Sequence, residues 1–405
     1  MEMVRFGELY AIPSGNGLSR PSAVRGEGYR MIGMGELFAN DIINDMEMER
    51  VQMSERELAS FLVEENDLLF ARQSMVASGA GKCSIVKEII EPTTYESHLI
   101  RVRLNKEKCN PWFYYYLFKL PDNPIKAIVN QCAQAGIRGN ELVKVKVPLP
   151  KKEHQDRIAS ILSNYDNLIE VNNKRIKVLE QMVENLYKEW FVRFRFPGHE
   201  TAEFENGLPK GWEYKRFEDV FDYVRGASYS SDEIDCVDGE NLINLKNIQG
   251  FGGFRKDGTK KYCGEYRPEQ TVGYKDLIMG VTDMTQDRRT VGAVALVPNI
   301  EGIISADLIK LNSSIDNVFS YCMFRWGFYS TYISQFGNGA NVIHLKPSAI
   351  KNAKLLIPNE LIINEFAALL NPVIDQIEHL SAKTENLIKQ RDLLLPRLMS
   401  GKLEV

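Results

Sequence analysis

The stretch DRIASILSNYDNLIEVNNKRIKVLEQMVENLYKEW, residues 156–190, lies in the middle of a chain of 405 residues and predicts one long helix. Its apolar side chains recur every seven residues in two rows. Such a heptad forms a seam for a second helix, whereas a helix lying on a sheet shows a broader apolar stripe. Asn172 is the polar member of the seam and is expected to fix its register. The seam consists of Ile158, Leu162, Tyr165, Ile169, Asn172, Ile176, Leu179, Val183 and Leu186.

A partner for this helix is predicted near the C-terminus, in NEFAALLNPVIDQIEHLSAKTENLIKQRDLLLPRLMSGK, residues 364–402. An alignment of the two helical sequences that matches Ile158 with Phe366 also matches Leu179 with Leu387. Pro396 is expected to end or kink this second helix. Two helices of this kind can pair antiparallel as a coiled coil. The second seam consists of Phe366, Val373, Leu380, Leu387 and Leu394.

The segments before the two helices also resemble each other. ENDLLFARQSMVASGAGKCSIV, residues 65–86, resembles YKDLIMGVTDMTQDRRTVGAVALV, residues 274–297, and each predicts a strand, a polar loop and a second strand. NPWFYYYLFKL, residues 110–120, resembles DNVFSYCMFRWGF, residues 316–328, and both predict aromatic-rich helices capped by Asn110 or Asp316. The aromatic run from Trp112 to Tyr116 is typical of helix core, with a base-stacking platform as the alternative.

These patterns predict an α+β protein with an internal repeat. Two β-rich globular domains are joined by two long antiparallel coiled-coil helices, so that a pseudo-twofold axis relates the halves. The expected domains are residues 1–150 and 196–358, and the expected helical spacers are residues 151–195 and 359–405. A rod with a reading head at either end suits two half-sites on one face of DNA, and two different heads predict two different half-sites.

Charge and cysteine usage restrict the class further. The formal net charge of −4 disfavours a nucleic-acid partner, but residues 119–152 are locally basic and allow a DNA-facing surface. The chain has no run of apolar residues long enough for a membrane span and no signal peptide, so a cytoplasmic protein is expected.

The six cysteines form no C-x-x-C pair, which predicts reduced thiols and neither a disulfide frame nor a zinc site. They are Cys83, Cys109, Cys132, Cys236, Cys263 and Cys322.

The sequence offers little support for catalysis by this chain. No glycine-rich cofactor loop opens a strand–turn–helix unit, and VASGAGKC, residues 76–83, lacks the first glycine and the Ser or Thr of a phosphate-binding loop. The five histidines show no metal-ligand spacing, so no metal site is predicted. A chain without its own enzymatic activity and without its own cofactor is therefore expected.

The helical motifs resemble a known family. Residues 149–191, the sequence GLPKGW at residues 207–212 and the ending LLLPRLMSGKLEV at residues 393–405 resemble the specificity subunits of type I restriction–modification systems. The resemblance covers nearly the whole chain and implies two target-recognition domains, with a central and a distal helical region. The first domain departs from it, because it begins without an equivalent of GLPKGW, which leaves its N-terminal boundary open.

The resemblance implies a role in host defence and a set of partners. The chain would bind double-stranded DNA at a bipartite, asymmetric target with an unread gap. Its helices would dock two methyltransferase subunits, which use S-adenosylmethionine to methylate adenine. Restriction subunits that translocate DNA with ATP and Mg²⁺ would complete a type I endonuclease. The target bases and the gap length are not readable from the sequence.

Candidate DNA contacts are side chains on loops that can pair with base edges or phosphates. Arg and Lys suit guanine, Asn and Gln suit adenine, and Ser and Thr are general; some contacts position the protein on phosphate only. In the first domain they are Arg20, Arg30, Arg72, Gln73, Ser74, Lys82, Gln134, Arg138 and Asn140. In the second domain they are Lys246, Asn247, Arg255, Lys256, Thr282, Gln286, Arg288, Arg289, Asn338, Asn341 and His344.

Two other functions remain open from the residues alone. The main one is a coiled-coil scaffold with two protein-interaction domains, which composition and net charge allow. The weaker one is a DNA-modifying enzyme whose motifs are not recognisable. Dependence of function on DNA separates the scaffold from a DNA reader, and binding of S-adenosylmethionine or a metal by the isolated chain would favour the enzyme.

Overall fold

Two long helices carry the heptad rows. In the computed structural model, α5 spans Lys152–Tyr187 and continues as a π-helical turn at Lys188–Val192, while α9 spans Glu360–Met399. All the side chains of the two predicted seams are buried or half-buried. No helix in the described part of the chain has both the length and the apolar character that crossing a membrane requires.

Pro396 does not end the second helix, because α9 continues through it to Met399, so this half of the expected end or kink is wrong. A proline within a helix removes one backbone donor and crowds the preceding turn, so packing has to hold the last turn of α9 in place. Leu395, Leu398 and Met399 supply that packing, since all three are buried in the core of the first unit described below.

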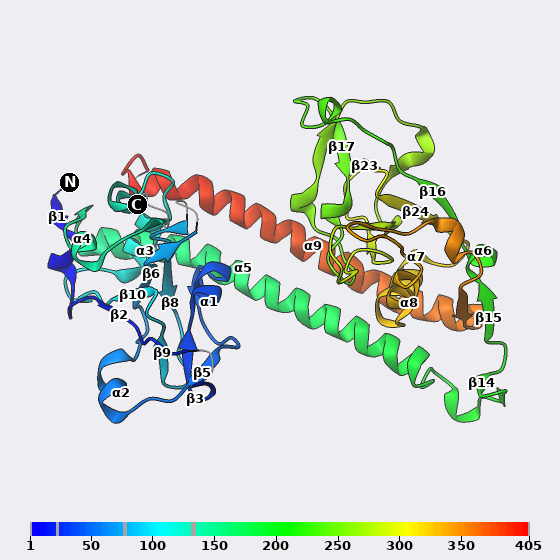
Figure 1. The fold of residues 1–405 in the computed structure, drawn as a ribbon, viewed down its shortest axis with the longest axis horizontal. Helices are drawn as coiled ribbons and strands as arrows, with labels where there is room; N and C mark the ends of the chain where they lie inside the picture. The colour runs from blue at the N-terminus through cyan, green and yellow to red at the C-terminus, as the bar shows by residue number, and fades with distance from the viewer. Residues whose placement is uncertain (1, 22–23, 76–78, 131–134, 404–405) are drawn as a thin grey trace. The chain divides into compact units, whose positions relative to one another are not determined.

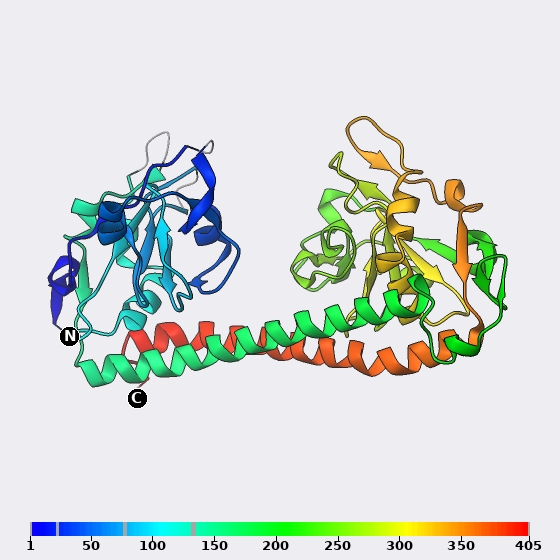
Figure 2. The same ribbon diagram turned by 90° about the horizontal axis from the view of Figure 1, so that it is seen from below.

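The structure describes residues 2–21, 24–75, 79–130 and 135–403, and these form two units (Figures 1 and 2). The first unit contains residues 1–170 and 385–405, and the second contains residues 171–384. Each unit takes in a segment of α5 and a segment of α9. The domain limits predicted from the sequence therefore stay a prediction.

The first unit is built on a five-stranded sheet of order β2-β10-β6-β8-β4, with a three-stranded sheet β5-β3-β9 beside it and the pairs β1-β12 and β11-β7. Its helices are α1 (Met34–Ala39), α2 (Glu55–Phe61), α3 (Pro111–Lys119) and α4 (Gly139–Leu142). Its strands are β1 (Met3–Arg5), β2 (Gly15–Asn16), β3 (Arg25–Ile32), β4 (Ile42–Ile43), β5 (Glu49–Val51), β6 (Leu68–Ala71), β7 (Gln73–Ser74), β8 (Cys83–Val86), β9 (Thr93–Tyr95), β10 (Leu99–Val102), β11 (Ala135–Gly136) and β12 (Lys146–Pro148).

The second unit has a four-stranded sheet β16-β24-β20-β22, a second sheet β18-β17-β23-β19 and the pairs β15-β26, β21-β25 and β13-β14. Its helices are α6 (Phe217–Val220), α7 (Asn317–Trp326) and α8 (Tyr329–Ser334). Its strands are β13 (Phe204–Glu205), β14 (Leu208–Pro209), β15 (Glu213–Arg216), β16 (Asp222–Arg225), β17 (Glu240–Ile243), β18 (Lys260–Tyr262), β19 (Thr271–Val272), β20 (Leu277–Gly280), β21 (Thr282–Asp283), β22 (Val294–Leu296), β23 (Gly302–Ile304), β24 (Leu308–Asn312), β25 (Ile343–His344) and β26 (Lys354–Ile357).

The two units repeat one topology, which confirms the predicted α+β fold with an internal repeat. The order β2-β10-β6-β8 corresponds to β16-β24-β20-β22, and the pair β1-β12 corresponds to β15-β26. Each unit also contains one parallel pair outside its central sheet, β3 with β9 and β17 with β23. The strand–loop–strand segments aligned in the sequence are β6 to β8 and β20 to β22.

The aromatic helices occupy equivalent places and belong to the cores. α3 packs on β8, and α7 packs on β20 and β22 (Figure 1). The side chains of Asn110 and Asp316 accept hydrogen bonds from backbone N–H groups of the first turn, which confirms both predicted caps. The residues from Phe113 to Tyr116 are almost fully buried, so the aromatic run is core and not a stacking platform.

Within each unit, α5 and α9 run antiparallel. In the first unit Ile158 and Leu162, near the start of α5, share a core with Leu398, near the end of α9. In the second unit Trp190, which follows α5, stacks on Phe366 at the start of α9. The start of α5 therefore contacts the end of α9 in the first unit, and the end of α5 contacts the start of α9 in the second. This is the predicted antiparallel pairing.

One prediction about the cysteines is wrong. Cys236 and Cys263 form a disulfide in the second unit, whereas all thiols were expected to be reduced. Their spacing gives no signal, because a β-bridge between Ile234 and Tyr262 brings the two cysteines together. Cys83, Cys109 and Cys322 are buried free thiols, and Cys132 lies outside the described residues.

Candidate nucleic-acid interface

A two-stranded ribbon organises the candidate residues of the second unit. β21 pairs antiparallel with β25, placing Thr282 opposite His344 and Asp283 opposite Ile343. The loop after β21 and the loop before β25 therefore lie side by side, although more than fifty residues separate them along the chain. Nε2 of Gln286 donates to the carbonyl oxygen of Ala340 at 2.6 Å and joins the two loops. Two predicted groups of DNA contacts thus become one surface.

Asp283 holds the first of these loops in shape. Its buried carboxylate accepts hydrogen bonds from the backbone N–H groups of Thr285 and Thr290, both at 2.7 Å, and from the hydroxyl of Thr285 at 2.8 Å. Burial alone would raise the pKa of Asp283, but the N–H donors of Thr290 and Thr285 outweigh it and keep the pKa below its ordinary value. The carboxylate is therefore an ionised anchor for the loop.

The arginines of this loop are positioned differently. Arg288 adopts a left-handed backbone, with φ of 52°, and its guanidinium donates to the carbonyl oxygen of Ser334 at 3.0 Å. Arg289 is exposed and pairs with Asp287 at the surface. A non-glycine residue in this region of the Ramachandran map is strained and persists where surrounding contacts hold it. Other exposed side chains of the ribbon are those of Asn338, Asn341 and His344.

The first unit has a matching ribbon. β7 pairs with β11, with Gln73 opposite Gly136 and Ser74 opposite Ala135. The backbone N–H of Ile137 donates to the carbonyl oxygen of Arg72, and this bond brings Arg138 next to the β7 loop. Arg138 and Asn140 are exposed at the start of α4. Gln134 lies outside the described residues.

The charged groups of three candidates of the first unit bind partners outside this ribbon. Arg20 pairs with Glu57 at 2.5 Å, and Arg30 on β3 pairs with Glu91 at 2.8 Å. The ammonium of Lys82 donates to the carbonyl oxygen of Phe38 at 2.7 Å. Acidic or carbonyl partners within the protein already use these cations, so their structural role is better supported than a DNA contact.

The basic segment of the second unit is only partly available. Asn247 is fully buried, and its amide donates to the carbonyl oxygen of Arg255 and to the hydroxyl of Thr259. Asn247 is therefore a structural residue, and its prediction as a DNA contact is wrong. Lys256 pairs with Glu378 of α9 at 3.0 Å, and Arg255 pairs with Asp257 at the surface, while Lys246 is exposed.

Thr282 is also unsuitable as a direct contact. Its side chain is buried, and its hydroxyl donates to the carboxylate of Asp307 at 2.9 Å. The strand position that made Thr282 a candidate turns its side chain inward, while the residues that follow it in the loop are exposed. Both residues of β21 are buried, so its position in the strand and not in the loop removes Thr282 from the surface.

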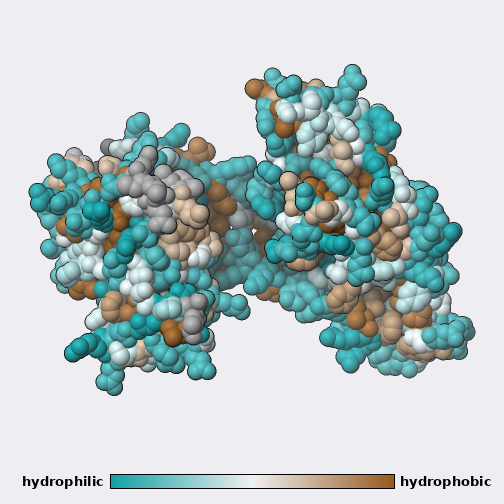
Figure 3. Space-filling view, in the orientation of Figure 1, coloured by the Kyte–Doolittle hydropathy of each residue, from teal (hydrophilic) through white to brown (hydrophobic). Residues whose placement is uncertain are grey.

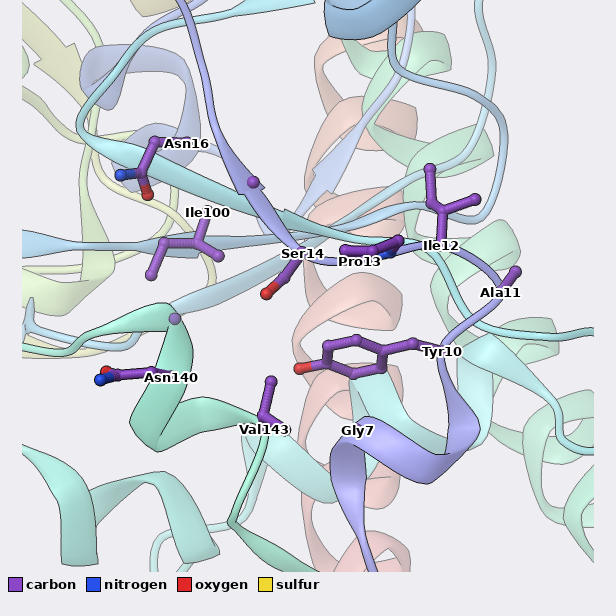
Figure 4. Close-up of a pocket in the computed structure, with 12 residues that line it drawn as sticks. Gly7, Tyr10, Ala11, Ile12, Pro13, Ser14, Asn16, Ile100, Asn140 and Val143 are labelled. Atoms are coloured by element: carbon purple, nitrogen blue, oxygen red, sulfur yellow. The ribbon is translucent and has the colours of Figure 1, made fainter.

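A cavity of about 600 Å³ opens beside α4 in the first unit. Ser14, Ile100 and Val143 line it, and the phenol of Tyr10 points into it between Ser14 and Val143 (Figure 4). The Tyr10 hydroxyl oxygen is buried and has no hydrogen-bond partner among the described residues. Asn140 lies on the wall, but its amide points away from the Tyr10 ring (Figure 4).

Sequence reasoning missed two exposed residues on the ribbons. Met75 follows β7 and is 91% exposed, and Met284 follows β21 and is 77% exposed. On the face shown in Figure 3, hydrophobic residues form small, separate patches on a mostly hydrophilic surface. The signal was available, because the two aligned strand–loop–strand segments place methionine at the same position. An apolar residue after a strand is ordinarily interpreted as core, however.

The described residues contain no cluster of three or more His, Cys, Asp or Glu side chains suited to a metal ion. What the two ribbons offer is a set of exposed amide, imidazole and guanidinium groups on antiparallel strands. A ribbon of this width fits the major groove of B-form DNA, where such groups can pair with base edges. The arrangement is suited to recognition of base edges.

The chain is similar to known specificity subunits and to their family model. A family model described as the type I restriction modification DNA specificity domain matches residues 1–181. The chain is 27% identical over 310 residues to the type I restriction enzyme MjaIX specificity subunit of Methanocaldococcus jannaschii, covering 72% of this chain and 69% of that protein. It is 26% identical over 360 residues to the putative type I restriction enzyme MjaX specificity subunit of the same organism, covering 87% and 82%.

A solved structure supports the fold. The crystal structure of a type I restriction-modification system S subunit from M. genitalium superposes with a TM-score of 0.61 at 13% identity, covering 98% of this chain and 95% of that chain. At this identity the likeness concerns the fold alone.

Proposed function

Because the chain belongs to the family of type I restriction–modification specificity subunits, we propose that it recognises a bipartite, asymmetric DNA target and has no catalytic activity of its own. The observation that carries this proposal is the repeated ribbon. One topology occurs twice in one chain, and each copy presents a ribbon whose exposed side chains differ from those of the other. Two ribbons with the same topology but different exposed side chains imply two different half-sites.

Each ribbon enters the major groove of its half-site. In the second unit Asn338, Asn341 and Arg289 supply the base-edge or phosphate contacts, while Gln286 holds the two loops together. In the first unit the exposed Arg138 and Asn140 supply them. The helices α5 and α9, which both units share, set the length of the unread gap. The alternative, a protein-only scaffold, predicts a function that does not depend on DNA.

The helices also dock the partner subunits. An apolar hollow of about 640 Å³ lies between α5 and α9 in the second unit. Val178, Met182 and Leu369 border it and are 68%, 45% and 52% exposed, a pattern typical of a surface that another protein covers. The partners that dock on the helices are two methyltransferase subunits, which use S-adenosylmethionine to methylate adenine. Restriction subunits with ATP and Mg²⁺ join the same assembly.

The test is a map of methylated bases. The chain is expressed with its neighbouring methyltransferase subunit in a host that lacks DNA methylation, and the modified adenines are located by sequencing. We expect one new motif split by a fixed gap. Failure to find a motif, with both proteins folded and associated, would favour the scaffold.

A matched pair of variants sharpens this test. Arg289→Ala is expected to relax or abolish recognition of one half of the motif only, because each unit reads its half independently. Arg216→Ala is the control, since Arg216 is equally exposed in the second unit but lies on β15, away from the ribbon, and pairs with Asp219. A change in both halves, or an equal effect of both variants, would contradict modular reading.

A further inference from the structure

Met75 and Met284 are exposed at equivalent places in the two units. Each methionine directly follows the first strand of a ribbon, β7 in the first unit and β21 in the second. The alignment that matches Leu68 with Leu277 at the start of the preceding strands also matches the two methionines without a gap. Both side chains are largely in solvent, at 91% and 77% exposure.

Neither methionine contributes to a hydrophobic core of the described structure. A single exposed apolar residue needs no explanation, because much of any protein surface is apolar. Here the same residue type stands at the same point of both ribbons, although the residues before it differ, Ser74 in one unit and Asp283 in the other. The loop after β21 is otherwise polar, so Met284 is its one apolar side chain between Asp283 and Thr290.

From this placement we infer that Met75 and Met284 each contact the 5-methyl group of a thymine, one in each half-site. The inference rests on the proposed function. The major groove admits a two-stranded ribbon, and the thymine methyl is the apolar group that unmodified bases display there. Methionine suits this contact because its thioether is unbranched, flexible and polarizable. The neighbouring polar side chains read hydrogen-bonding groups, and the methionine adds a requirement for thymine.

The experiment measures binding of the full chain with its methyltransferase subunits to duplexes that carry the split motif. Each thymine of the motif is replaced singly by deoxyuridine, which removes only the methyl group. We expect one thymine in each half whose replacement weakens binding about fourfold, the value for removing one buried methyl group. Met284→Gln should abolish the effect of deoxyuridine in one half only, and Met75→Gln should abolish it in the other.

The controls separate this inference from the proposed function. Met284→Leu keeps an apolar group and should retain the sensitivity to deoxyuridine. Met3→Gln and Val237→Thr change exposed apolar residues away from the ribbons and should leave it unaltered. Wild-type complex that binds the split motif but tolerates every deoxyuridine, or Met→Gln variants that keep the wild-type sensitivity, would overturn the inference and leave the proposed function standing. Absence of any split-motif binding would instead overturn the proposed function.

Discussion

The contact of the aromatic helix with α5 and α9 is polar in the first unit and apolar in the second. In the first unit the carboxylate of Asp166 on α5 is buried and accepts from the guanidinium of Arg391 on α9 at 2.5 Å. The hydroxyl of Tyr116 on α3 donates to the same carboxylate at 2.6 Å. This buried network raises the pKa of Tyr116, first by burial and then by the negative charge of Asp166.

The internal repeat places apolar residues at the corresponding positions of the second unit. The alignment of the two helices matches Asp166 with Ile374 and Arg391 with Val183, and the alignment of the aromatic helices matches Tyr116 with Cys322. Val183 and Cys322 are buried in one cluster, and Ile374 packs against it. One backbone arrangement thus accepts either an ion pair with a tyrosine or three apolar side chains.

This difference shows that the repeat determines topology and leaves the chemistry of equivalent positions free. A buried ion pair is weak evidence for stability, because desolvation offsets much of its Coulomb energy. Its value lies elsewhere: a carboxylate on α5 that requires a guanidinium on α9 penalises any slipped pairing of the two helices. The second unit has no equivalent penalty at these positions and relies on the shapes of its aromatic core.

Removing half of the ion pair is the change with the largest expected effect. Arg391→Val leaves the Asp166 carboxylate, 6% exposed, without its cation, and should destabilise the first unit by about 3 kcal/mol. The lower end of the usual range applies because the Arg391 side chain is 22% exposed. Hydrogen exchange of the last turns of α9 measures the loss locally, which avoids assuming two-state unfolding of a two-unit chain.

The matched variant copies the second unit into the first. Tyr116→Cys, Asp166→Ile and Arg391→Val together should recover most or all of the lost stability, since apolar replacement of a buried ion pair is often neutral or stabilising. A triple variant as unstable as Arg391→Val alone would show that the first unit cannot accept the apolar side chains of the second unit in place of its ion pair.

The sequence predicts the features that rest on local pattern or on repetition. Heptad rows identify α5 and α9, and the capping residues Asn110 and Asp316 mark the start of the aromatic helices. Alignment of the strand–loop–strand segments also predicts that the loops near Arg72 and Gln286 are equivalent. These properties depend on residues that are close in the chain or recur at a fixed interval.

The rest depends on pairings that no interval encodes. The Cys236–Cys263 disulfide follows from one β-bridge, and the inward orientation of Asn247 follows from a turn that closes on Arg255 and Thr259. Arg20 and Arg30 resemble free cations in the sequence because their acidic partners lie on other elements. The ribbons themselves join loops that are far apart in the chain. The sequence therefore identifies candidate residues but does not show which of them lie together on one surface.

The ribbons of the two units also differ, since Asp283 in the second unit aligns with Ser74 in the first. Asp283→Ala removes the acceptor of two backbone N–H groups and should lower the free energy of local opening by about 2 kcal/mol. Hydrogen exchange of the Thr285 and Thr290 amides measures this change. Asp283→Ser, which copies the first unit, keeps one acceptor and should lose less; an equal loss would show that charge, not hydrogen bonding, organises the loop.

The same residue gives this loop a dependence on pH. The folded pKa of Asp283 lies below its unfolded value, so its stabilising contribution is complete above the unfolded pKa and is lost as pH falls through the folded pKa. In the wild-type chain, the free energy of opening the loop should therefore decrease in acid. The Asp283→Ser variant should show no such decrease at these two amides, and an acid-sensitive serine variant would assign the effect to another group.

The smallest effect is expected where the first unit carries a hydroxyl that the second lacks. Tyr10 and Phe221 are equivalent. Tyr10 follows a short helical turn at Phe6–Leu9 and packs edge-on against Phe6, and Phe221 follows α6 and packs tilted against Phe217. Burial raises the pKa of Tyr10 well above its ordinary value, so the phenol stays protonated at neutral pH. Its oxygen has no partner in the described structure.

Tyr10→Phe should therefore change the free energy of unfolding by less than about 1 kcal/mol, and in the stabilising direction, because it removes a buried polar atom that makes no hydrogen bond. Phe221→Tyr is the reciprocal change and should cost more, about 1–3 kcal/mol, because Phe221 is 3% exposed and the added hydroxyl would be buried. Denaturant titration of each variant against wild type gives both values. A clear loss of stability in Tyr10→Phe would mean that water or a ligand in the neighbouring cavity satisfies the hydroxyl, and the first unit would then possess a polar site with no counterpart in the second.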